Sequence, residues 1–189
     1  GAYEETEKRI QEALEERMEV LNENGVIDQP LTKEILNKLS AKSPETYFGA
    51  SRNNFFGNGK VGVTGDQNGL IISSQIKTNT LYLSGDWNIT NEFAKNNSDS
   101  ASIVYKYNAK DVFFVAEADS KITVEALLDG KPINNNTGED IIKTPDEKTV
   151  LEIKEAGLYK IIQGSQSETH TLELKIQKSG LKAFTFTFG

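Results

Sequence analysis

A two-residue alternation of apolar and polar side chains dominates the sequence from Thr46 onward. It is clearest in Ile122–Ala126, His170–Ile176 and Phe184–Phe188. Side chains of an extended strand point alternately to opposite faces, so this pattern predicts strands with one buried and one solvated face. Because no helical period of three to four residues interrupts the alternation, residues 46–189 are predicted to be all-β.

Turn-forming pairs such as Asn58-Gly59, Asn68-Gly69, Asp129-Gly130 and Ser179-Gly180 divide this region into about ten short strands. That arrangement is typical of a sandwich or barrel, and we predict a jelly-roll-type antiparallel β-sandwich over residues 46–189. The other predicted strands are Tyr47–Phe56, Leu70–Ser73, Thr80–Ser84, Trp87–Thr90, Ala101–Tyr107, Val112–Ala118, Val150–Ile153 and Leu158–Ile162.

Residues 1–45 follow a different pattern and are predicted to form an N-terminal helical segment. Apolar residues such as Ile10, Leu14 and Leu21 recur at helical spacing, and Asn24-Gly25 is a typical helix end. A second short helix is predicted from Thr32 to Ala41. The chain is therefore divided into residues 1–45 and residues 46–189.

Composition excludes several classes of function. The net charge of −7 is concentrated in residues 1–45, which carry −5, while residues 46–189 carry −2. Binding to nucleic acid needs clustered Lys and Arg, so no nucleic-acid partner is expected, and a nearly neutral surface suits an uncharged ligand. No apolar run reaches the roughly 18 residues of a membrane span, and no membrane contact is expected.

The chain contains no cysteine and one histidine, His170. Disulfides, thiolate nucleophiles and cysteine zinc sites are therefore absent, and one histidine cannot build a multi-histidine metal site. No G-x-S-x-G motif or singled-out carboxylate pair supports a hydrolase, although an esterase or glycosidase is kept as a third alternative. No catalytic residue is predicted.

Several pieces of the sequence occur together in a known family. Ser43–Arg52 (SPETYFGASR), Leu83–Trp87 (LSGDW), His170–Lys175 (HTLELK) and Gly180–Gly189 (GLKAFTFTFG) resemble the C-terminal region of DipZ-type thiol–disulfide interchange proteins. Ala2–Leu14 is similar to the last helix of the thioredoxin-like domain in those proteins.

The resemblance implies a fold and a setting. Residues 46–189 would correspond to a β-sandwich like a carbohydrate-binding module, and residues 1–45 to the end of a truncated thioredoxin-like domain plus a helical linker. The family's redox chemistry requires a Cys-x-x-Cys pair, which this chain lacks. The resemblance thus implies an accessory module outside the cytoplasm, in the periplasm or at the cell surface, within a membrane-anchored parent.

Trp87 is the only tryptophan, and it follows the turn-like Ser84-Gly85-Asp86. Its indole ring could stack on a sugar, with Asp86 or Asn88 holding hydroxyl groups and Tyr82 as a further platform. The alternative is that Trp87 fills one end of the core. Tyr47 is another possible platform.

Arg52 is the only arginine in residues 46–189. The planar guanidinium suits a carboxylate or a ring face better than lysine does. Arg52 is therefore expected either to pair with an aspartate such as Asp86 or to line a ligand groove.

The remaining polar candidates receive structural roles. His170 is expected to be hydrogen-bonded and partly buried, and Phe184, Phe186 and Phe188 are expected in the core. Carboxylates are common in the predicted loops and could hold a structural Ca²⁺, but no D-x-D-x-D-G motif is present. The loop aspartates concerned are Asp66, Asp86, Asp99, Asp119 and Asp140.

Two functions remain open after this reasoning. The first is a non-catalytic module that binds a glycan or glycoprotein and positions a thioredoxin-like protein. The second is a docking or self-association module that packs on the thioredoxin-like domain of its parent, which the orphan helix over residues 4–23 favours.

Overall fold

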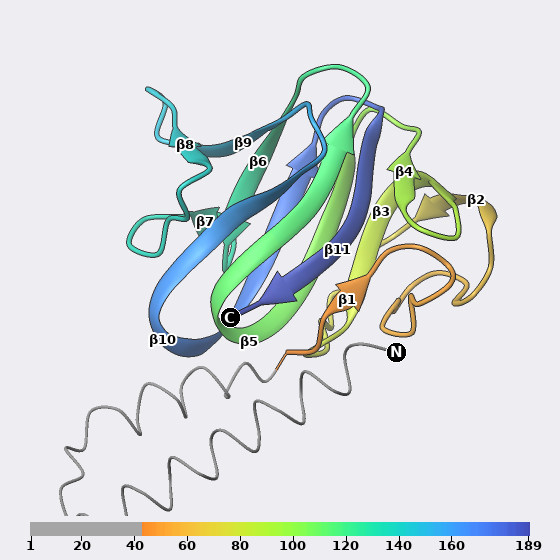
Figure 1. Cartoon of the computed structure of the whole chain (residues 1–189), viewed down its shortest axis with the longest axis horizontal. Helices are drawn as coiled ribbons and strands as arrows, with labels where there is room; N and C mark the ends of the chain where they lie inside the picture. The colour runs from red at the N-terminus through yellow and green to blue at the C-terminus, as the bar shows by residue number, and fades with distance from the viewer. Residues whose placement is uncertain (1–42) are drawn as a thin grey trace, which may run out of the picture. The chain divides into compact units, whose positions relative to one another are not determined.

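A computed structural model describes residues 43–189, and nearly all of the predicted N-terminal helical segment lies outside this range. The described part is built of strands joined by turns and loops (Figure 1). The strands are β1 (Thr46–Tyr47), β2 (Gly65–Leu70), β3 (Leu81–Ile89), β4 (Ala94–Asn96), β5 (Ala101–Ala118), β6 (Ile122–Leu128), β7 (Lys131–Pro132), β8 (Ile141–Lys143), β9 (Thr149–Ile153), β10 (Gly157–Ile176) and β11 (Leu181–Phe188).

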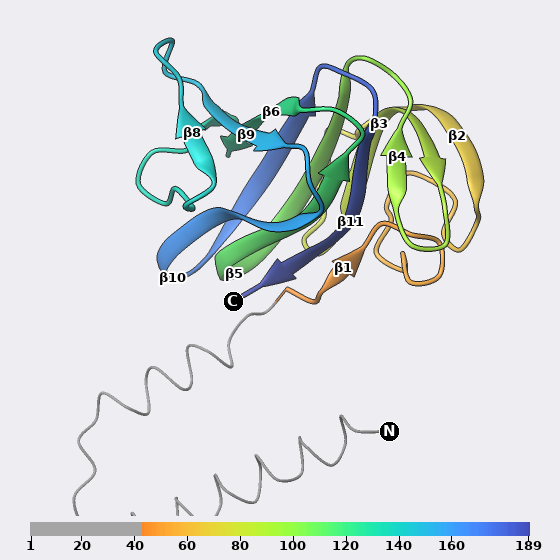
Figure 2. The same ribbon diagram turned by 45° about the horizontal axis from the view of Figure 1, so that its top comes forward.

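The named strands pair antiparallel in the order β1-β11-β4-β3-β5-β10-β6-β9-β8, with β2 on β3 and β7 on β6. Figures 1 and 2 show β5, β10 and β11 crossing the middle, with β8 and β9 on one side and β2 and β4 on the other. The predicted all-β antiparallel sandwich is confirmed, while the jelly-roll type stays a prediction.

The two longest strands, β5 and β10, join the layers of the sandwich. The first half of β5 pairs with β3 and its second half with β11. The opposite edge of β5 pairs with β10, whose later residues also pair with β6. Sequence alternation predicted each of these strands as two separate ones. In β10, the register shift between Gln163 and Glu168 breaks the period of two.

The strand predicted from Tyr47 to Phe56 is wrong beyond Tyr47. After β1, the chain leaves the sheet and forms a loop in which the N–H of Arg52 donates to the carbonyl of Gly49 (3.1 Å) and the N–H of Phe56 to the carbonyl of Asn53 (3.0 Å). The turn predicted at Gly85 is also absent. Gly85 has a φ of 89°, which only glycine adopts readily, and this allows β3 to continue from Leu81 to Ile89.

An aromatic cluster fills the space between the layers. Tyr105 of β5 lies 5.7 Å from Phe186 of β11 between ring centroids, and Phe186 lies 5.0 Å from Phe114. Phe48, which follows β1, lies 5.4 Å from Phe186. All four rings are at most 1% exposed, so the loop after β1 is anchored in the same core.

Candidate functional site

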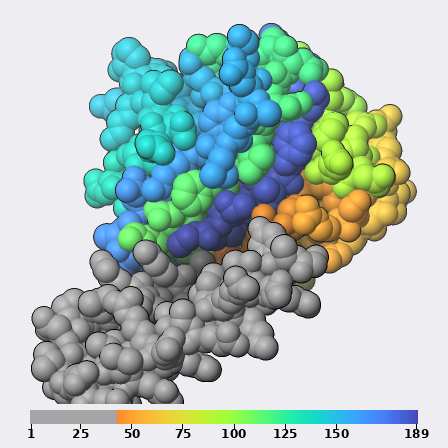
Figure 3. Space-filling model, viewed as in Figure 1, coloured from red at the N-terminus to blue at the C-terminus, as the bar shows by residue number. Residues whose placement is uncertain are grey.

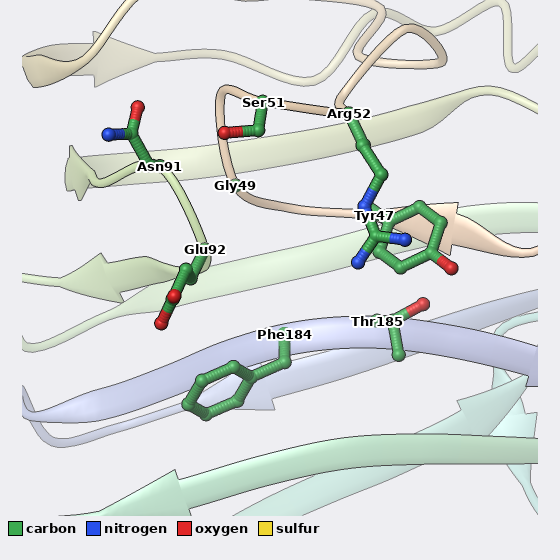
Figure 4. A pocket seen from close by; sticks show the side chains of 8 residues that line it. All are labelled: Tyr47, Gly49, Ser51, Arg52, Asn91, Glu92, Phe184 and Thr185. Atoms are coloured by element: carbon green, nitrogen blue, oxygen red, sulfur yellow. The ribbon is translucent and has the colours of Figure 1, made fainter. Parts of the chain in front are cut away.

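A cavity of about 320 Å³ opens between β1, β11 and the turn that joins β3 to β4 (Figure 4). This volume is near the lower end of the range for small-molecule sites, so it suits a small ligand. The cavity is lined by Tyr47, Gly49, Ser51, Arg52, Asn91, Glu92, Phe184 and Thr185.

The loop after β1 is held against two other elements by backbone hydrogen bonds. The N–H of Phe48 donates to the carbonyl of Phe184 (3.0 Å), which ties the loop to β11. The N–H groups of Ala50 and Ser51 donate to the carbonyls of Thr90 (2.8 Å) and Asn91 (3.2 Å), which ties it to the β3–β4 turn. The position of the cavity wall is therefore fixed by main-chain contacts.

The turn between β3 and β4 supplies the opposite wall. The Thr90 hydroxyl accepts from the N–H groups of Glu92 (3.2 Å) and Phe93 (3.0 Å), and the Thr90 N–H donates to the Phe93 carbonyl (2.8 Å). Such side-chain bonds to the backbone are a typical way for threonine to fix a tight turn. Asn91 and Glu92 are thereby held at the tip, where both are exposed.

A β-bulge in β11 brings Phe184 to the cavity. In the pairing with β5, Ala183 lies opposite Ala116 and Thr185 lies opposite Val115, so Phe184 is an extra residue. A bulge re-aims the side chains on its strand. Phe184 is consequently only half-buried and packs on Phe93 at 5.3 Å, and the prediction that it belongs to the core is wrong.

Arg52 stacks on Tyr47, with the guanidinium carbon 3.6 Å from the ring centroid. Figure 4 shows the Arg52 side chain directed onto this ring, with Glu92 on the other side of the cavity. A hydrogen bond from Tyr47 to Glu45 is the main cause that raises the pKa of Tyr47. Arg52 lines the cavity, and its role in holding a ligand stays a prediction. The pair with Asp86 is not formed, because Asp86 accepts from the N–H of Gly69 (2.7 Å) instead.

The side chains that line the cavity include hydrogen-bond donors and acceptors, and they lie beside two aromatic rings. Arg52 is a donor, Glu92 is an acceptor, and Asn91 and Ser51 can do both. All four side chains are exposed, and the two charges have opposite signs. The arrangement can therefore hold a small, uncharged molecule that carries several hydroxyl groups and an apolar face.

The family model described as "Thioredoxin like C-terminal domain" matches residues 43–189. The chain belongs to this family. Two relatives, Protein DipZ of Mycobacterium bovis and Protein DipZ of Mycobacterium tuberculosis, are each 27% identical over 156 residues. Each alignment covers 82% of this chain and 19% of the relative, so the chain spans about a fifth of their length. This is the family predicted from the sequence pieces.

Solved structures similar to this thioredoxin-like C-terminal domain are distant. A family two carbohydrate esterase from Clostridium thermocellum in complex with cellohexaose is 13% identical, with a TM-score of 0.40, over 52% of this chain and 27% of that chain. A family two carbohydrate esterase from Cellvibrio japonicus is 9% identical, with a TM-score of 0.39, over 76% and 32%. Neither ligand nor activity can be carried over at this distance.

Of the five ligand-binding residues predicted in this thioredoxin-like C-terminal domain, the structure brings only Arg52 to the cavity. Trp87 is 0% exposed, and its indole N–H donates to the carbonyl of Ser84 (2.8 Å), so stacking on a ligand is ruled out and the core alternative is correct. Tyr82 is 4% exposed, and its hydroxyl accepts from the N–H of Lys77 (3.3 Å). Its role as a platform is also wrong, because the ring is covered.

Asp86 and Asn88 lie on β3, away from the cavity lining. The Asn88 amide donates to Asp66 (2.7 Å), across the pairing of β3 with β2. Sequence reasoning missed Ser51, Asn91, Glu92 and Phe184. A four-residue Thr-Asn-Glu-Phe segment between two strands does indicate a hairpin tip, but nothing in it indicates which other loop it will face.

The other polar residues are occupied by local partners. The carboxylates of Asp129 and Glu168 lie within hydrogen-bond distance of the His170 imidazole (2.6 Å from Nδ1 and 3.2 Å from Nε2) and accept from it. The His170 side chain is 22% exposed, so it is hydrogen-bonded and partly buried, as predicted. The aspartates proposed for calcium each contact a different partner, for example Asp99 with the N–H of Ser179 and Asp140 with the N–H of Lys160.

Within residues 43–189, no group of three or more acidic or histidine side chains is arranged to hold a metal. The same residues contain no helix that is long and apolar enough to cross a membrane.

Proposed function

We propose that residues 43–189 are a non-catalytic accessory module of an extracytoplasmic, membrane-anchored thiol–disulfide interchange protein, and that the cavity binds carbohydrate. Family membership supports the accessory role. Since the chain has no cysteine, thiol chemistry would belong to another part of the protein.

The observation that carries the carbohydrate proposal is the composition of the cavity wall. Tyr47 and Phe184 supply apolar ring surface, while Arg52, Glu92, Asn91 and Ser51 supply hydrogen bonds. Sugars combine an apolar ring face with a rim of hydroxyl groups, and each hydroxyl both donates and accepts. A wall with one acid, one base and two neutral polar groups matches that chemistry without favouring an ion.

The proposal is tested with the 189-residue chain on a glycan array, followed by calorimetry with β-1,4-linked glucose and N-acetylglucosamine oligomers. Arg52→Ala and Glu92→Gln are each expected to weaken binding about tenfold, as the loss of one or two hydrogen bonds of about 1 kcal/mol does. Lys121→Ala is the matched control, because Lys121 is an exposed lysine paired with Glu152 and does not line the cavity.

Trp87 provides the check on folding. It is buried in the core, so its fluorescence follows the fold of every variant and does not depend on contact with a sugar. Variants with an unchanged Trp87 spectrum and weaker binding support the site. Absence of binding across the array, or binding that both cavity variants leave unchanged, overturns the proposal.

A further inference from the structure

Strand register places a row of side chains across the outer face of the sheet, starting at the cavity. Tyr47 of β1 lies opposite Thr185 of β11, Thr185 lies opposite Val115 of β5, and Val115 lies opposite Leu158 of β10. We call these four residues the cross-strand row. Strands are about 4.8 Å apart, so the row extends about 14 Å from Tyr47 to Leu158.

The cross-strand row is on the outward-facing side of its strands. Thr46, Phe114 and Phe186 alternate with the row and point into the core, which directs Tyr47, Val115 and Leu158 outward. Figure 3 shows β11 at the surface between β1 and β5. Tyr47 and Val115 are half-buried, and Leu158, at the far end, is 60% exposed. Thr185, between Tyr47 and Val115, is only 8% exposed, and its hydroxyl donates to the carbonyl of Thr46 (3.0 Å), so it forms the floor of the row.

Leu158 is unusual for its position. A leucine that is 60% exposed on a strand removes little apolar area from water in the folded chain, so it contributes little to stability there. A single exposed leucine needs no explanation by itself. Here, however, it ends a row that begins in the cavity, and Phe113 extends the apolar surface on the next outward position of β5.

The charges on both sides of the row are already paired. On one side, Lys182 lies 2.7 Å from Glu117. On the other, Lys160 lies 3.7 Å from Asp111, and its ammonium lies 5.4 Å from the centroid of the Phe113 ring. These four charged side chains are 18–29% exposed. The row is therefore a neutral, mildly apolar strip with a neutralised ion pair on each flank.

Resting on the proposed function, we infer that the ligand is an unbranched, uncharged oligosaccharide that runs perpendicular to the strands. One unit occupies the cavity between Arg52 and Glu92, and the following units lie over Thr185, Val115 and Leu158. An anionic polysaccharide does not fit the row, because both flanking lysines are engaged by carboxylates. A branch on the chain would meet the ion pair at Lys182 or the one at Lys160.

The test is calorimetry on the 189-residue chain with β-1,4-linked glucose and N-acetylglucosamine oligomers of one, two, four and six units. The dissociation constant is expected to fall about tenfold between two units and four, because longer chains reach the far end of the row. Leu158→Glu is expected to remove that gain for the longer oligomers and to leave binding of the disaccharide unchanged. Arg52→Ala weakens all lengths.

Ile71→Glu is the matched control, since it places the same charge on an exposed aliphatic residue, 82% exposed, outside the row. Leu158→Ala is the second variant, in case the glutamate disturbs β10, and it should lose part of the same gain. Equal affinity for two and six units would overturn the inference that the ligand lies along the cross-strand row, as would a length dependence that the Leu158 variants do not change. Either result leaves the proposal of binding in the cavity standing. Failure of every length to bind overturns the proposed function itself.

Discussion

At the scale of single residues, Gly49 determines how closely the loop after β1 approaches the β3–β4 turn. A Cβ atom at this position would overlap the backbone of Asn91 and Glu92. The neighbouring Ala50 and Ser51 donate their hydrogen bonds to the same turn. The absence of a side chain at Gly49 is therefore what allows these bonds and brings the two walls of the cavity together.

Replacing Gly49 with alanine is expected to lower the free energy of unfolding by about 1–3 kcal/mol, because the backbone on one side must move to admit the methyl group. Urea denaturation monitored by Trp87 fluorescence measures the change. Gly157→Ala is the control, since its nearest neighbour would be in ordinary contact at 3.5 Å. If the Gly49→Ala protein is as stable as the Gly157→Ala protein, the close contact between Gly49 and the β3–β4 turn does not require glycine.

His170 is a second residue whose environment has a measurable consequence. Partial burial lowers the pKa of His170, but hydrogen bonds to Asp129 and Glu168 outweigh this effect and raise the pKa above its ordinary value. The other groups that face this cluster are the Tyr107 ring, 6.1 Å from the imidazole, and Lys106, whose charge acts on Asp129. The protonated form is therefore favoured in the folded chain.

The sign of the pH dependence follows from that direction. A pKa raised on folding adds stability that is fully present below the unfolded value of about 6.5 and is lost as the pH rises through the folded value. Urea unfolding at a series of pH values between 5.5 and 8.5 should thus show stability falling with pH, and His170→Gln should flatten the slope. Stability that rises over this window in the unmodified chain would contradict the assignment.

At the scale of elements, alternation predicted which segments form strands, but it did not predict their irregularities. Ile122–Ala126 keeps a strict period and forms the first five residues of β6. Phe184, by contrast, follows the same alternation as Phe186 yet turns outward. Its bulge arises from the pairing of β11 with β5 and cannot be read from β11 alone.

The sequence predicted only part of the candidate site, because some of its residues are brought together by contacts between distant segments. Arg52 could be singled out because it is the only arginine in its region, and its planar group suits a ring or an anion. For Trp87 the sequence left a ligand platform and a core position both open, because rarity does not distinguish a buried tryptophan from an exposed one. Asn91 and Glu92 became site residues only through backbone bonds to a loop about 40 residues earlier.

Asn96 of β4 is 0% exposed, and its side chain links β4 to β11 and to the turns that precede β5 and β11. Its amide oxygen accepts from the N–H of Leu181 (2.7 Å), and its amide nitrogen donates to the carbonyls of Ser98 (2.9 Å) and Lys178 (3.2 Å). The start of β11 is therefore held to the end of β4 by one buried side chain.

Asn96→Ala is expected to destabilise the fold by about 2–4 kcal/mol, because it removes the partner of the buried N–H of Leu181 and of the part-buried carbonyls of Ser98 and Lys178. The melting temperature and urea midpoint measure the loss. Asn88→Ala removes an asparagine whose amide bonds only to the exposed Asp66, and it should change stability by less than about 0.5 kcal/mol. Similar losses for the two variants would mean that burial of Asn96 is not what matters.

At the scale of the whole described domain, β5 and β10 connect the strands of both layers into one continuous hydrogen-bonded order. The beginning and end of the domain are also fixed. Ser43 donates to the carbonyl of Asn108 through its N–H (3.2 Å) and to Asn79 through its hydroxyl (2.7 Å). At the other end, the N–H of Gly189 donates to the carbonyl of Asp111 (3.1 Å).

The short strand β1 gives the cavity a mechanical property. β1 has only two residues, it pairs on one edge with β11, and Tyr47 lies four residues after Ser43. Tension applied along the chain at residue 43 would break the bonds at Ser43 and then peel β1 from β11, while β5 and β10 stayed in place. The cavity wall formed by Tyr47 and Arg52 would leave first, so the binding proposed for this cavity is expected to weaken under load before the sandwich yields.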